Sequence, residues 1–237
     1  MRILCVIPAR SGSVGIKDKN IQEIDGKPLI GIAVEKALSA PLVDRVVLST
    51  DSEKYAEVGR YFGAEVPFIR PAELADSKTR LHYVLQHTLA HFDSNEDKYD
   101  AVLSLQASAP LVSIETINNC LSAFVEGELE AVGTGSKIVT GHPYLAKKVN
   151  DAGVAHDYLE LASNVARYPR QVRPDLYFFN GCLYIRKRNL VEEIDDSKNA
   201  LGGYPHLIPI PDDEAINIDE PFDLKIAKLI HKEKRND

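Results

Sequence analysis

The stretch Ile3-Leu4-Cys5-Val6-Ile7-Pro8-Ala9-Arg10-Ser11-Gly12-Ser13-Val14-Gly15-Ile16-Lys17-Asp18-Lys19-Asn20 decides the fold of this chain. It opens with an apolar run short enough for a buried strand and continues into a loop with two glycines, two serines and three cations. Such a loop brings backbone N–H groups and positive charge close to a polyphosphate. Its spacing matches neither G-x-x-x-x-G-K-[ST] nor G-x-G-x-x-G, so a solvated basic turn remains the alternative from composition alone.

Apolar strands alternate with amphipathic helices through the first half of the chain. The expected strands cover residues 2–8, 45–50 and 101–106, and the expected helices cover residues 28–39, 51–62, 79–92 and 113–126. This alternation predicts an α/β fold with a doubly wound, mostly parallel sheet. Ligands bind at the carboxyl ends of the strands in such sheets. The Arg10 loop, Thr50-Asp51 and Gln106-Ala107-Ser108 all fall at those ends.

The pattern loosens in the second half. Residues 139–176 are rich in proline, glycine and polar residues, with no clear helical period beyond about 157–166. This is too long for a plain loop in a compact domain. We interpret it as an insertion within a single domain of residues 1–237, and packing on another subunit is one explanation. Order returns with an expected strand at 177–185, a strand near 206–210 and a closing helix at 220–232.

The composition is that of an ordinary globular chain with a net charge of −7, from 28 basic and 35 acidic residues. No general attraction to nucleic acid is expected, so an anion site must be local. No apolar run approaches the roughly 20 residues of a membrane span, and residues 1–8 lead straight into the loop rather than forming a signal peptide. Cys5, Cys120 and Cys182 are scattered in apolar contexts, which favours buried thiols in a reduced cytoplasmic protein.

Several charged residues have both a functional and a structural interpretation. Asp219, just before the closing helix, suits either a Mg²⁺ ligand or a helix cap, and Asn217 would point to the same face as a neutral oxygen ligand. Asp51 is interpreted first as the cap of the helix that follows it. Arg70 suits contact with a phosphate or a simple ion pair with Glu73.

A basic stretch and a histidine pair complete the candidates. Arg167, Arg170 and Arg173 suggest a site for an anionic substrate such as a carboxylate sugar, with a surface loop or subunit contact as the alternative. His87 and His91 have i,i+4 spacing, but no Glu follows His87 as the zinc-protease pattern requires. We therefore do not expect a metal at this histidine pair.

Taken together, six segments resemble the acylneuraminate cytidylyltransferases, also called CMP-sialic acid synthetases. The first is the loop motif at 7–20. The others, in chain order, are Ser49-Thr50-Asp51, Arg70-Pro71-Ala72-Glu73-Leu74-Ala75, Leu105-Gln106-x-Ser108-x-Pro110-Leu111, Asn180-Gly181-x-x-Tyr184-Ile185 and Ile218-Asp219-Glu220-Pro221-x-Asp223-Leu224. The resemblance covers nearly the whole chain.

The resemblance implies a Rossmann-like fold of the nucleotide-diphospho-sugar transferase type and a homodimer with an inserted dimerisation segment. It also implies a Mg²⁺-dependent reaction that joins CTP to a nine-carbon 2-keto acid sugar and releases pyrophosphate. Catalytic roles are expected for Arg10, Lys19 and Asp219, with Asn217 beside Asp219 at the metal. The nucleotide is expected at Arg10, Ser13, Gly15, Lys17, Lys19, Asn20 and Arg70. The sugar is expected at Gln106, Arg170, Asn180 and Tyr184.

The chain departs from the family pattern at a few positions. Members usually carry Lys where this chain has Val14, and Lys17 is a hypothetical substitute. Many carry Asp where this chain has Asn217. Ala109 and Val112 also differ, in a segment expected near the sugar, so a related nonulosonic or 2-keto-deoxy acid competes with sialic acid as the substrate. Two competing functions stay open: a sugar-1-phosphate nucleotidyltransferase, and a weakly active or non-catalytic nucleotide-sugar-binding homologue.

Overall fold

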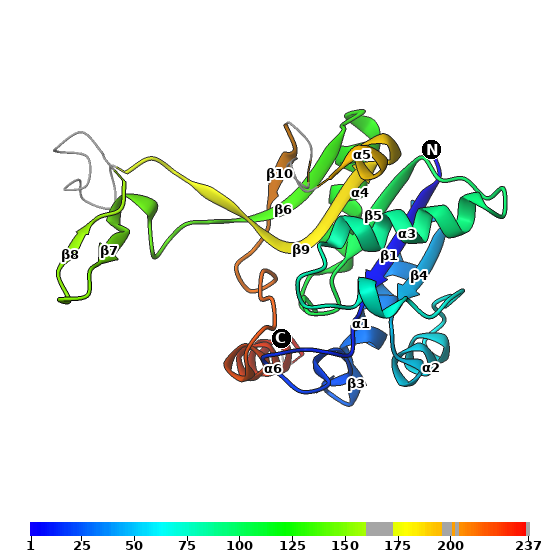
Figure 1. The fold of residues 1–237 in the computed structure, drawn as a ribbon, viewed down its shortest axis with the longest axis horizontal. Helices are drawn as coiled ribbons and strands as arrows, with labels where there is room; N and C mark the ends of the chain where they lie inside the picture. Colours follow the sequence, from blue (N-terminus) through cyan, green and yellow to red (C-terminus); the bar gives the residue numbers. More distant parts are fainter. Residues whose placement is uncertain (160–172, 196–200, 202–203, 236–237) are drawn as a thin grey trace.

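A six-stranded sheet runs through the centre of the molecule in the order β10-β6-β9-β5-β1-β4 (Figure 1). The structure is a computed structural model that describes residues 1–159, 173–195, 201 and 204–235. All neighbouring strands are parallel except β9, which runs antiparallel to both β5 and β6. The strands are β1 (Ile3–Pro8), β4 (Arg45–Ser49), β5 (Ala101–Leu105), β6 (Ala131–Lys137), β9 (Tyr177–Lys187) and β10 (His206–Pro209). The predicted mostly parallel α/β sheet is confirmed.

Helices pack on both faces of the sheet because successive side chains of a strand point to opposite sides. In β1, Ile3, Cys5 and Ile7 join the core formed with α1 and α4, whereas Leu4 and Val6 join the core formed with α3 and α5. The helices are α1 (Leu29–Leu38), α2 (Glu53–Tyr61), α3 (Leu81–Asp93), α4 (Ile114–Glu126), α5 (Arg188–Glu193) and α6 (Pro221–Lys234). No helix in the described part of the chain has both the length and the apolar character needed to cross a bilayer.

The last helix packs beside the first loop of the chain. A small apolar cluster joins Ala227 of α6 and the preceding Ile218 to Ile16 of the loop and Ile24 of a short hairpin. That hairpin pairs β2 (Glu23–Ile24) with β3 (Lys27–Pro28). The described residues also form three single-turn 3-10 helices, η1 (Lys19–Ile21), η2 (Ala72–Leu74) and η3 (Pro143–Leu145). The cluster thus brings the segment containing Asp219 to the loop after β1.

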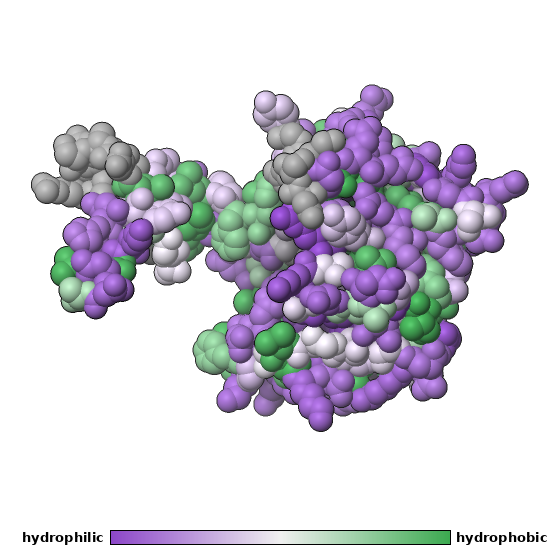
Figure 2. Space-filling model, in the orientation of Figure 1, coloured by the Kyte–Doolittle hydropathy of each residue, from purple (hydrophilic) through white to green (hydrophobic). Residues whose placement is uncertain are grey.

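An arm extends away from the α/β body (Figure 1). Its stem begins where β6 and β9 leave the sheet, paired as far as Lys137 and Tyr177. Its end carries a hairpin of β7 (Lys147–Val149) and β8 (Ala155–Asp157). Apolar surface is visible along the arm in Figure 2, and the exposed apolar side chains there include Val149, Val154 and Tyr158. The hairpin falls within the expected insertion at 139–176, whose residues 160–172 lie outside the described ranges.

The strand β6 was not expected from the sequence. Its Gly133, Thr134 and Gly135 are all buried. Side chains on neighbouring strands occupy the space beside the glycines: a Cβ at Gly133 would lie 2.8 Å from the Phe179 ring, and one at Gly135 would lie 2.6 Å from Leu207. The short helix α5 was also missed. Its Val191 is buried in the core on the α3 side of the sheet.

Two expected helix caps are replaced by the next residue in the chain. Ser52 caps α2 by accepting a hydrogen bond from the Tyr55 N–H at 3.4 Å, so the interpretation of Asp51 as the cap is wrong. Glu220 is the N-cap of α6 and forms a reciprocal capping box with Asp223. The capping interpretation of Asp219 is therefore also wrong. In both places, moving the cap by one residue leaves the preceding Asp carboxylate available for another contact.

Candidate active site

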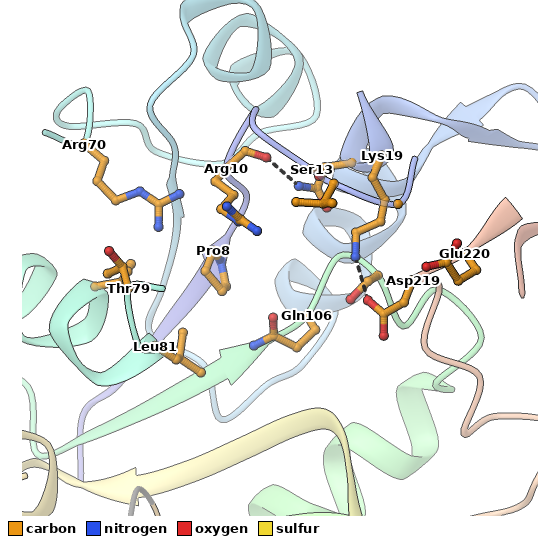
Figure 3. Close-up of a pocket in the computed structure, with 15 residues that line it drawn as sticks. Pro8, Arg10, Ser13, Lys19, Arg70, Thr79, Leu81, Gln106, Asp219 and Glu220 are labelled. Carbon is orange, nitrogen blue, oxygen red and sulfur yellow. Dashed lines mark hydrogen bonds and ion pairs between the residues drawn. The ribbon is translucent and has the colours of Figure 1, made fainter. Parts of the chain in front are cut away.

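A pocket of about 390 Å³ lies at the carboxyl ends of β1 and β5. This volume falls within the roughly 300–1,000 Å³ typical of small-molecule sites. Eight of the residues predicted for the site line it: Arg10, Ser13, Gly15, Lys19, Asn20, Arg70, Gln106 and Asp219. Figure 3 shows Arg10 and Arg70 on one side, Lys19 and Asp219 on the other, and Gln106 between the two groups. The structure therefore brings together residues as distant in sequence as Arg10 and Asp219.

The loop after β1 is fixed by hydrogen bonds at both ends. Asp51 accepts the Ser11 N–H at 2.8 Å and the Ser11 hydroxyl at 2.7 Å. At the other end, the buried Asn20 side chain donates to the Arg10 carbonyl at 3.1 Å. These contacts close the loop on itself and aim its central residues at the pocket. Asp51, released from capping α2, is thus a support for the loop.

Gly15 allows the loop to touch the segment before α6. A Cβ at this position would lie 2.3 Å from the Asp219 carbonyl oxygen and 3.2 Å from a Glu220 carboxylate oxygen. Real Cβ atoms do not approach backbone oxygens so closely, so a larger residue would force the two segments apart. Because glycine has no side chain, Gly15 allows the backbone of the loop to lie directly against the backbone at Asp219.

Arg70 is a buried cation, and few polar contacts offset the cost of burying its charge. Only 4% of the residue is exposed, and its Nε and Nη2 have no hydrogen-bond partner among the described residues. The predicted alternative pairing with Glu73 is not observed; the nearest carboxylate is that of Asp51, 4.0 Å away. Burial lowers the pKa of Arg70. The nearby Asp51 carboxylate raises this pKa and the Arg10 cation lowers it further, but the guanidinium stays charged. A buried donor left unpaired at a pocket wall indicates an anionic or polar ligand.

Lys19 and Asp219 form the other side of the pocket. Their side chains make an ion pair of 2.9 Å (Figure 3). The lysine is 17% exposed and the carboxylate 67% exposed. Glu220 also lines the pocket, so its charged lining is Arg10, Lys19, Arg70 and these two carboxylates. This local excess of cations contrasts with the acidic chain as a whole and suits a polyphosphate.

Val14, which stands where family members usually carry a lysine, lies on the pocket wall. The residue is 87% exposed. Lys17 is exposed and does not line the pocket. Its backbone carbonyl instead accepts a hydrogen bond from Gln22 at 3.0 Å. The structure therefore gives no support to Lys17 as a replacement for the loop lysine.

Three predicted residues lie outside the pocket, around the irregular turn in β9. Asn180 uses its amide to bind β6, donating to Ser136 and accepting from Thr134. Asn217 and Tyr184 both approach Gly181, whose Cβ would lie 3.6 Å from the Asn217 Nδ2 and 3.9 Å from the Tyr184 hydroxyl. The Asn217 Oδ1 is buried without a hydrogen-bond partner among the described residues, and burial raises the pKa of Tyr184.

The remaining candidates within the described ranges do not line the pocket. Arg167 and Arg170 lie outside the described residues, and Arg173 lies at the base of the arm. His87 and His91 pack against the Phe68 ring, with centroids 4.6 Å and 5.1 Å away. Ala109 and Val112 belong to the buried core and do not line the pocket, so these two departures from the family pattern do not touch it.

Sequence reasoning missed part of the pocket wall. Thr79, Leu81 and Val84 line it from the start of α3, and Glu220 lines it beside Asp219. The helix containing the first three residues was predicted, but nothing in its sequence marks its first turn as functional. The useful signal was topological: the connection between α2 and α3 runs parallel to β4 at Glu65, so the helix after it can begin at the ligand-binding edge.

Comparison with known proteins identifies relatives of this arrangement. The family model for cytidylyltransferases matches residues 4–198. A pseudaminic acid cytidylyltransferase of Campylobacter jejuni is 38% identical over 54% of this chain and 55% of its own length, so the match spans about half of that relative. A CMP-N,N'-diacetyllegionaminic acid synthase of Legionella pneumophila is 30% identical over 97% of this chain and 96% of its own length.

The fold also has a solved counterpart. A CMP:2-keto-3-deoxy-manno-octonic acid synthetase, solved in complex with CTP, superposes with a TM-score of 0.70 over 99% of this chain and 100% of that chain. The two sequences are 19% identical, so this likeness concerns the fold alone.

Proposed function

Because this chain belongs to the cytidylyltransferase family, we propose that it transfers CMP from CTP to an acidic 2-keto-deoxy sugar and releases pyrophosphate. The named relatives act on, or make the CMP derivatives of, pseudaminic and diacetyllegionaminic acids. Nonulosonic acids of this kind are therefore the first substrates to test. The observation that carries the proposal is the convergence of Arg10, Lys19 and the unpaired Arg70 on one pocket.

The reaction asks for charge stabilisation more than for covalent chemistry. The anomeric hydroxyl of the sugar gives up its proton to solvent as its oxygen forms a new bond to the α-phosphorus. The bond from the α-phosphorus to the oxygen shared with the β-phosphate breaks, and pyrophosphate departs with that electron pair. Arg10 and Lys19 would balance negative charge on the phosphates as it moves toward the leaving group. Arg70, fixed by burial, would orient the nucleotide. This division of roles accounts for a pocket rich in cations.

We propose that Asp219 holds Mg²⁺ together with phosphate oxygens. Its exposed carboxylate fits the preference of Mg²⁺ for one or two carboxylates supplemented by phosphates and waters. Within the described ranges, no group of three or more His, Cys, Asp or Glu side chains forms an all-protein metal site. When bound, the ion would supply positive charge to the reacting phosphates. Asn217, which does not line the pocket, is the weaker candidate as a second ligand.

We propose that the arm forms a homodimer with a second copy of the chain. It carries exposed Val149, Val154 and Tyr158 at a distance from the body (Figures 1 and 2). Apolar side chains gathered on a projecting segment are typical of an association surface. This assignment agrees with the dimerisation role expected for residues 139–176.

We also propose a cytoplasmic location. Cys5, Cys120 and Cys182 are buried and unpaired, and burial raises the pKa of each thiol. Unpaired buried cysteines suit a reducing compartment.

A pyrophosphate-release screen tests the proposed function. It crosses the four common nucleoside triphosphates with pseudaminic, legionaminic and sialic acids, 2-keto-3-deoxy-octonic acid and a sugar 1-phosphate, with and without Mg²⁺. The expected result is turnover only with CTP, an acid sugar and Mg²⁺. Turnover with a sugar 1-phosphate would assign the chain to the competing class of nucleotidyltransferases. CTP binding without turnover of any sugar would instead indicate a binding protein, a function that Val14 favours because it leaves the loop one cation short.

A further inference from the structure

Lys36 connects α1 to the loop that follows β5. It is half-buried on α1, and its ammonium donates hydrogen bonds to the backbone carbonyls of Pro110 and Val112, the latter at 2.6 Å. One side chain therefore fixes two residues of a loop that lies 74 and 76 positions away in sequence. Charge-assisted bonds to buried carbonyls are among the stronger hydrogen bonds in proteins.

The loop held by Lys36 reaches the active-site pocket at its beginning. Gln106 and Ser108 both line the pocket, only a few residues before Pro110. The Ser108 carbonyl accepts the Ile218 N–H at 2.7 Å. Ile218 is fully buried and directly precedes Asp219. The position of this loop therefore bears on Gln106 directly and on Asp219 through one backbone hydrogen bond.

A buried carboxylate holds the far end of the same loop. Glu214 accepts the Ser113 N–H at 2.9 Å and the Thr116 hydroxyl at 2.7 Å. It lies on the segment that leads to Asp219, so that segment and the loop are joined at two points, Glu214 with Ser113 and Ile218 with Ser108. Lys36 adds the third attachment, from helix α1.

We propose that Lys36 is a positioning residue for the transfer reaction, holding the loop from Gln106 to Ser113 so that Gln106 and Asp219 keep their places in the pocket. The roles of Gln106 and Asp219 in the reaction rest on the proposed function. The attachment of the loop by Lys36 does not depend on that function. A misplacement of reacting groups by about 1 Å can lower a rate by about a hundredfold. Residues that bind the nucleotide, Arg10 and Arg70, lie on other segments.

Both ionisation states of Lys36 can make these contacts. Burial lowers the pKa of Lys36 to about 8, while Glu214 on the segment before α6 favours the charged form and Lys234 on α6 disfavours it. A neutral amine still has N–H groups for both carbonyls. The positioning role is therefore expected on both sides of that pKa.

The test compares Lys36→Met with Lys36→Arg and with the control Lys27→Met. Lys27 precedes α1 and pairs only with the exposed Glu35, so its removal leaves the loop attached. Three quantities are measured for each variant: amide hydrogen exchange in peptides 104–113 and 214–220, the CTP dissociation constant, and kcat with KM for the best acid sugar.

Lys36→Met is expected to speed exchange in both peptides about tenfold or more and to lower kcat about tenfold, with CTP affinity within threefold of wild type. Lys36→Arg, which can donate to both carbonyls, should restore most of the exchange protection and of kcat. Lys27→Met should match wild type throughout. If Lys36→Met is too unstable to purify, Lys36→Gln, with one donor group, should give an intermediate loss.

The inference is overturned if wild-type exchange and kcat persist in Lys36→Met, or if CTP binding falls as much as kcat does. Failure of Lys36→Arg to recover either property would also contradict it. Hydrogen exchange and CTP binding need no turnover. A chain that transfers CMP to no acid sugar would defeat the proposed function while leaving the role of Lys36 in the loop open to these two measurements.

Discussion

The Lys19 ammonium lies 2.9 Å from an Asp219 carboxylate oxygen, joining two pocket residues from opposite ends of the chain. An ion pair with one well-exposed member contributes on the order of 0–1 kcal/mol, so phosphate oxygens can replace the carboxylate as the partner of Lys19, and a cation can replace the ammonium as the partner of Asp219, at little cost. The two side chains therefore neutralise each other in a contact weak enough to exchange for substrate. This relationship makes the behaviour of Asp219 testable with and without metal.

Asp219→Asn is expected to lower kcat by about tenfold or more in the presence of Mg²⁺, because it removes the carboxylate proposed to hold the ion. Without Mg²⁺, CTP should bind as tightly as in wild type or more tightly, because Lys19 is freed and a negative charge is removed. Calorimetric titration of CTP and pyrophosphate release measure the two effects. Asp213→Asn is the control, since Asp213 pairs with Lys234. Equal metal dependence in Asp219→Asn and wild type would contradict the assignment.

Arg70→Met should raise the CTP dissociation constant about tenfold or more without destabilising the fold. The buried guanidinium has two nitrogens without hydrogen-bond partners among the described residues, so burying its charge is costly and is offset only in part by Asp51, 4.0 Å away. The melting temperature of Arg70→Met should therefore equal or exceed that of wild type. Arg60→Met, which breaks a surface pair with Glu53, should leave CTP affinity unchanged. A variant that binds CTP normally would remove Arg70 from the nucleotide site.

Val14→Lys should lower the KM for CTP by about threefold to tenfold, because it adds a cation at an exposed position on the pocket wall. The gain should shrink at higher salt, as expected for a solvent-exposed charge. Lys17→Met should change KM by less than about twofold, since Lys17 does not line the pocket. Initial rates at two ionic strengths measure both variants. A larger loss in Lys17→Met than gain in Val14→Lys would restore Lys17 as the loop cation.

The pH dependence of stability should report the burial of Lys36. Its folded-state pKa of about 8 is depressed from the ordinary lysine value of 10.5, so between these values the unfolded chain binds more protons. The cost of burying the charged form is thus fully present below pH 8 and is relieved as pH rises toward 10. The free energy of unfolding of wild type minus that of Lys36→Met should rise over this interval by about 1–3 kcal/mol. Urea titrations at pH 7, 8, 9 and 10 measure it, and a flat difference would contradict the depressed pKa.

Val149→Asp combined with Val154→Asp should convert the proposed dimer to a monomer, because two charges would replace exposed apolar side chains of the arm. Light scattering during size-exclusion chromatography gives the mass directly. Asp151→Asn, within the same hairpin region, serves as a control with no expected change. A wild-type monomer at micromolar concentration would refute the proposed homodimer.

Apolar patterning was sufficient to predict most of the sheet and its helices. β1, β4 and β5 are continuous apolar runs, and such runs are typical of strands buried on both faces. β6 was missed because the features that mark it are spatial: Gly133 and Gly135 make room for Phe179 and Leu207, residues that a local sequence window does not contain. Its buried glycines therefore resemble loop glycines until the neighbouring strands are known.

Pocket residues were predicted where several polar and charged side chains are close together in the sequence. Pocket residues that line the wall only because of the way the chain folds were not predicted. The loop after β1 gave Arg10, Ser13, Gly15, Lys19 and Asn20, all of which line the pocket. Thr79 and Leu81 went unnoticed because ordinary residues at the start of a helix become pocket walls only through topology. The assignment of Asn180 to the sugar remains a prediction, although its side chain is already engaged with β6.

The separation of Lys19 and Asp219 also bears on how the protein is made. At about 5–20 residues per second, a ribosome needs roughly 10–40 s to travel from the first to the second. Throughout that time the nascent chain contains the basic loop but not the carboxylate that neutralises Lys19. A chain released before Asp219 is made could carry most of the sheet and still lack one wall of its pocket, so this activity has to wait until the segment before α6 has been translated.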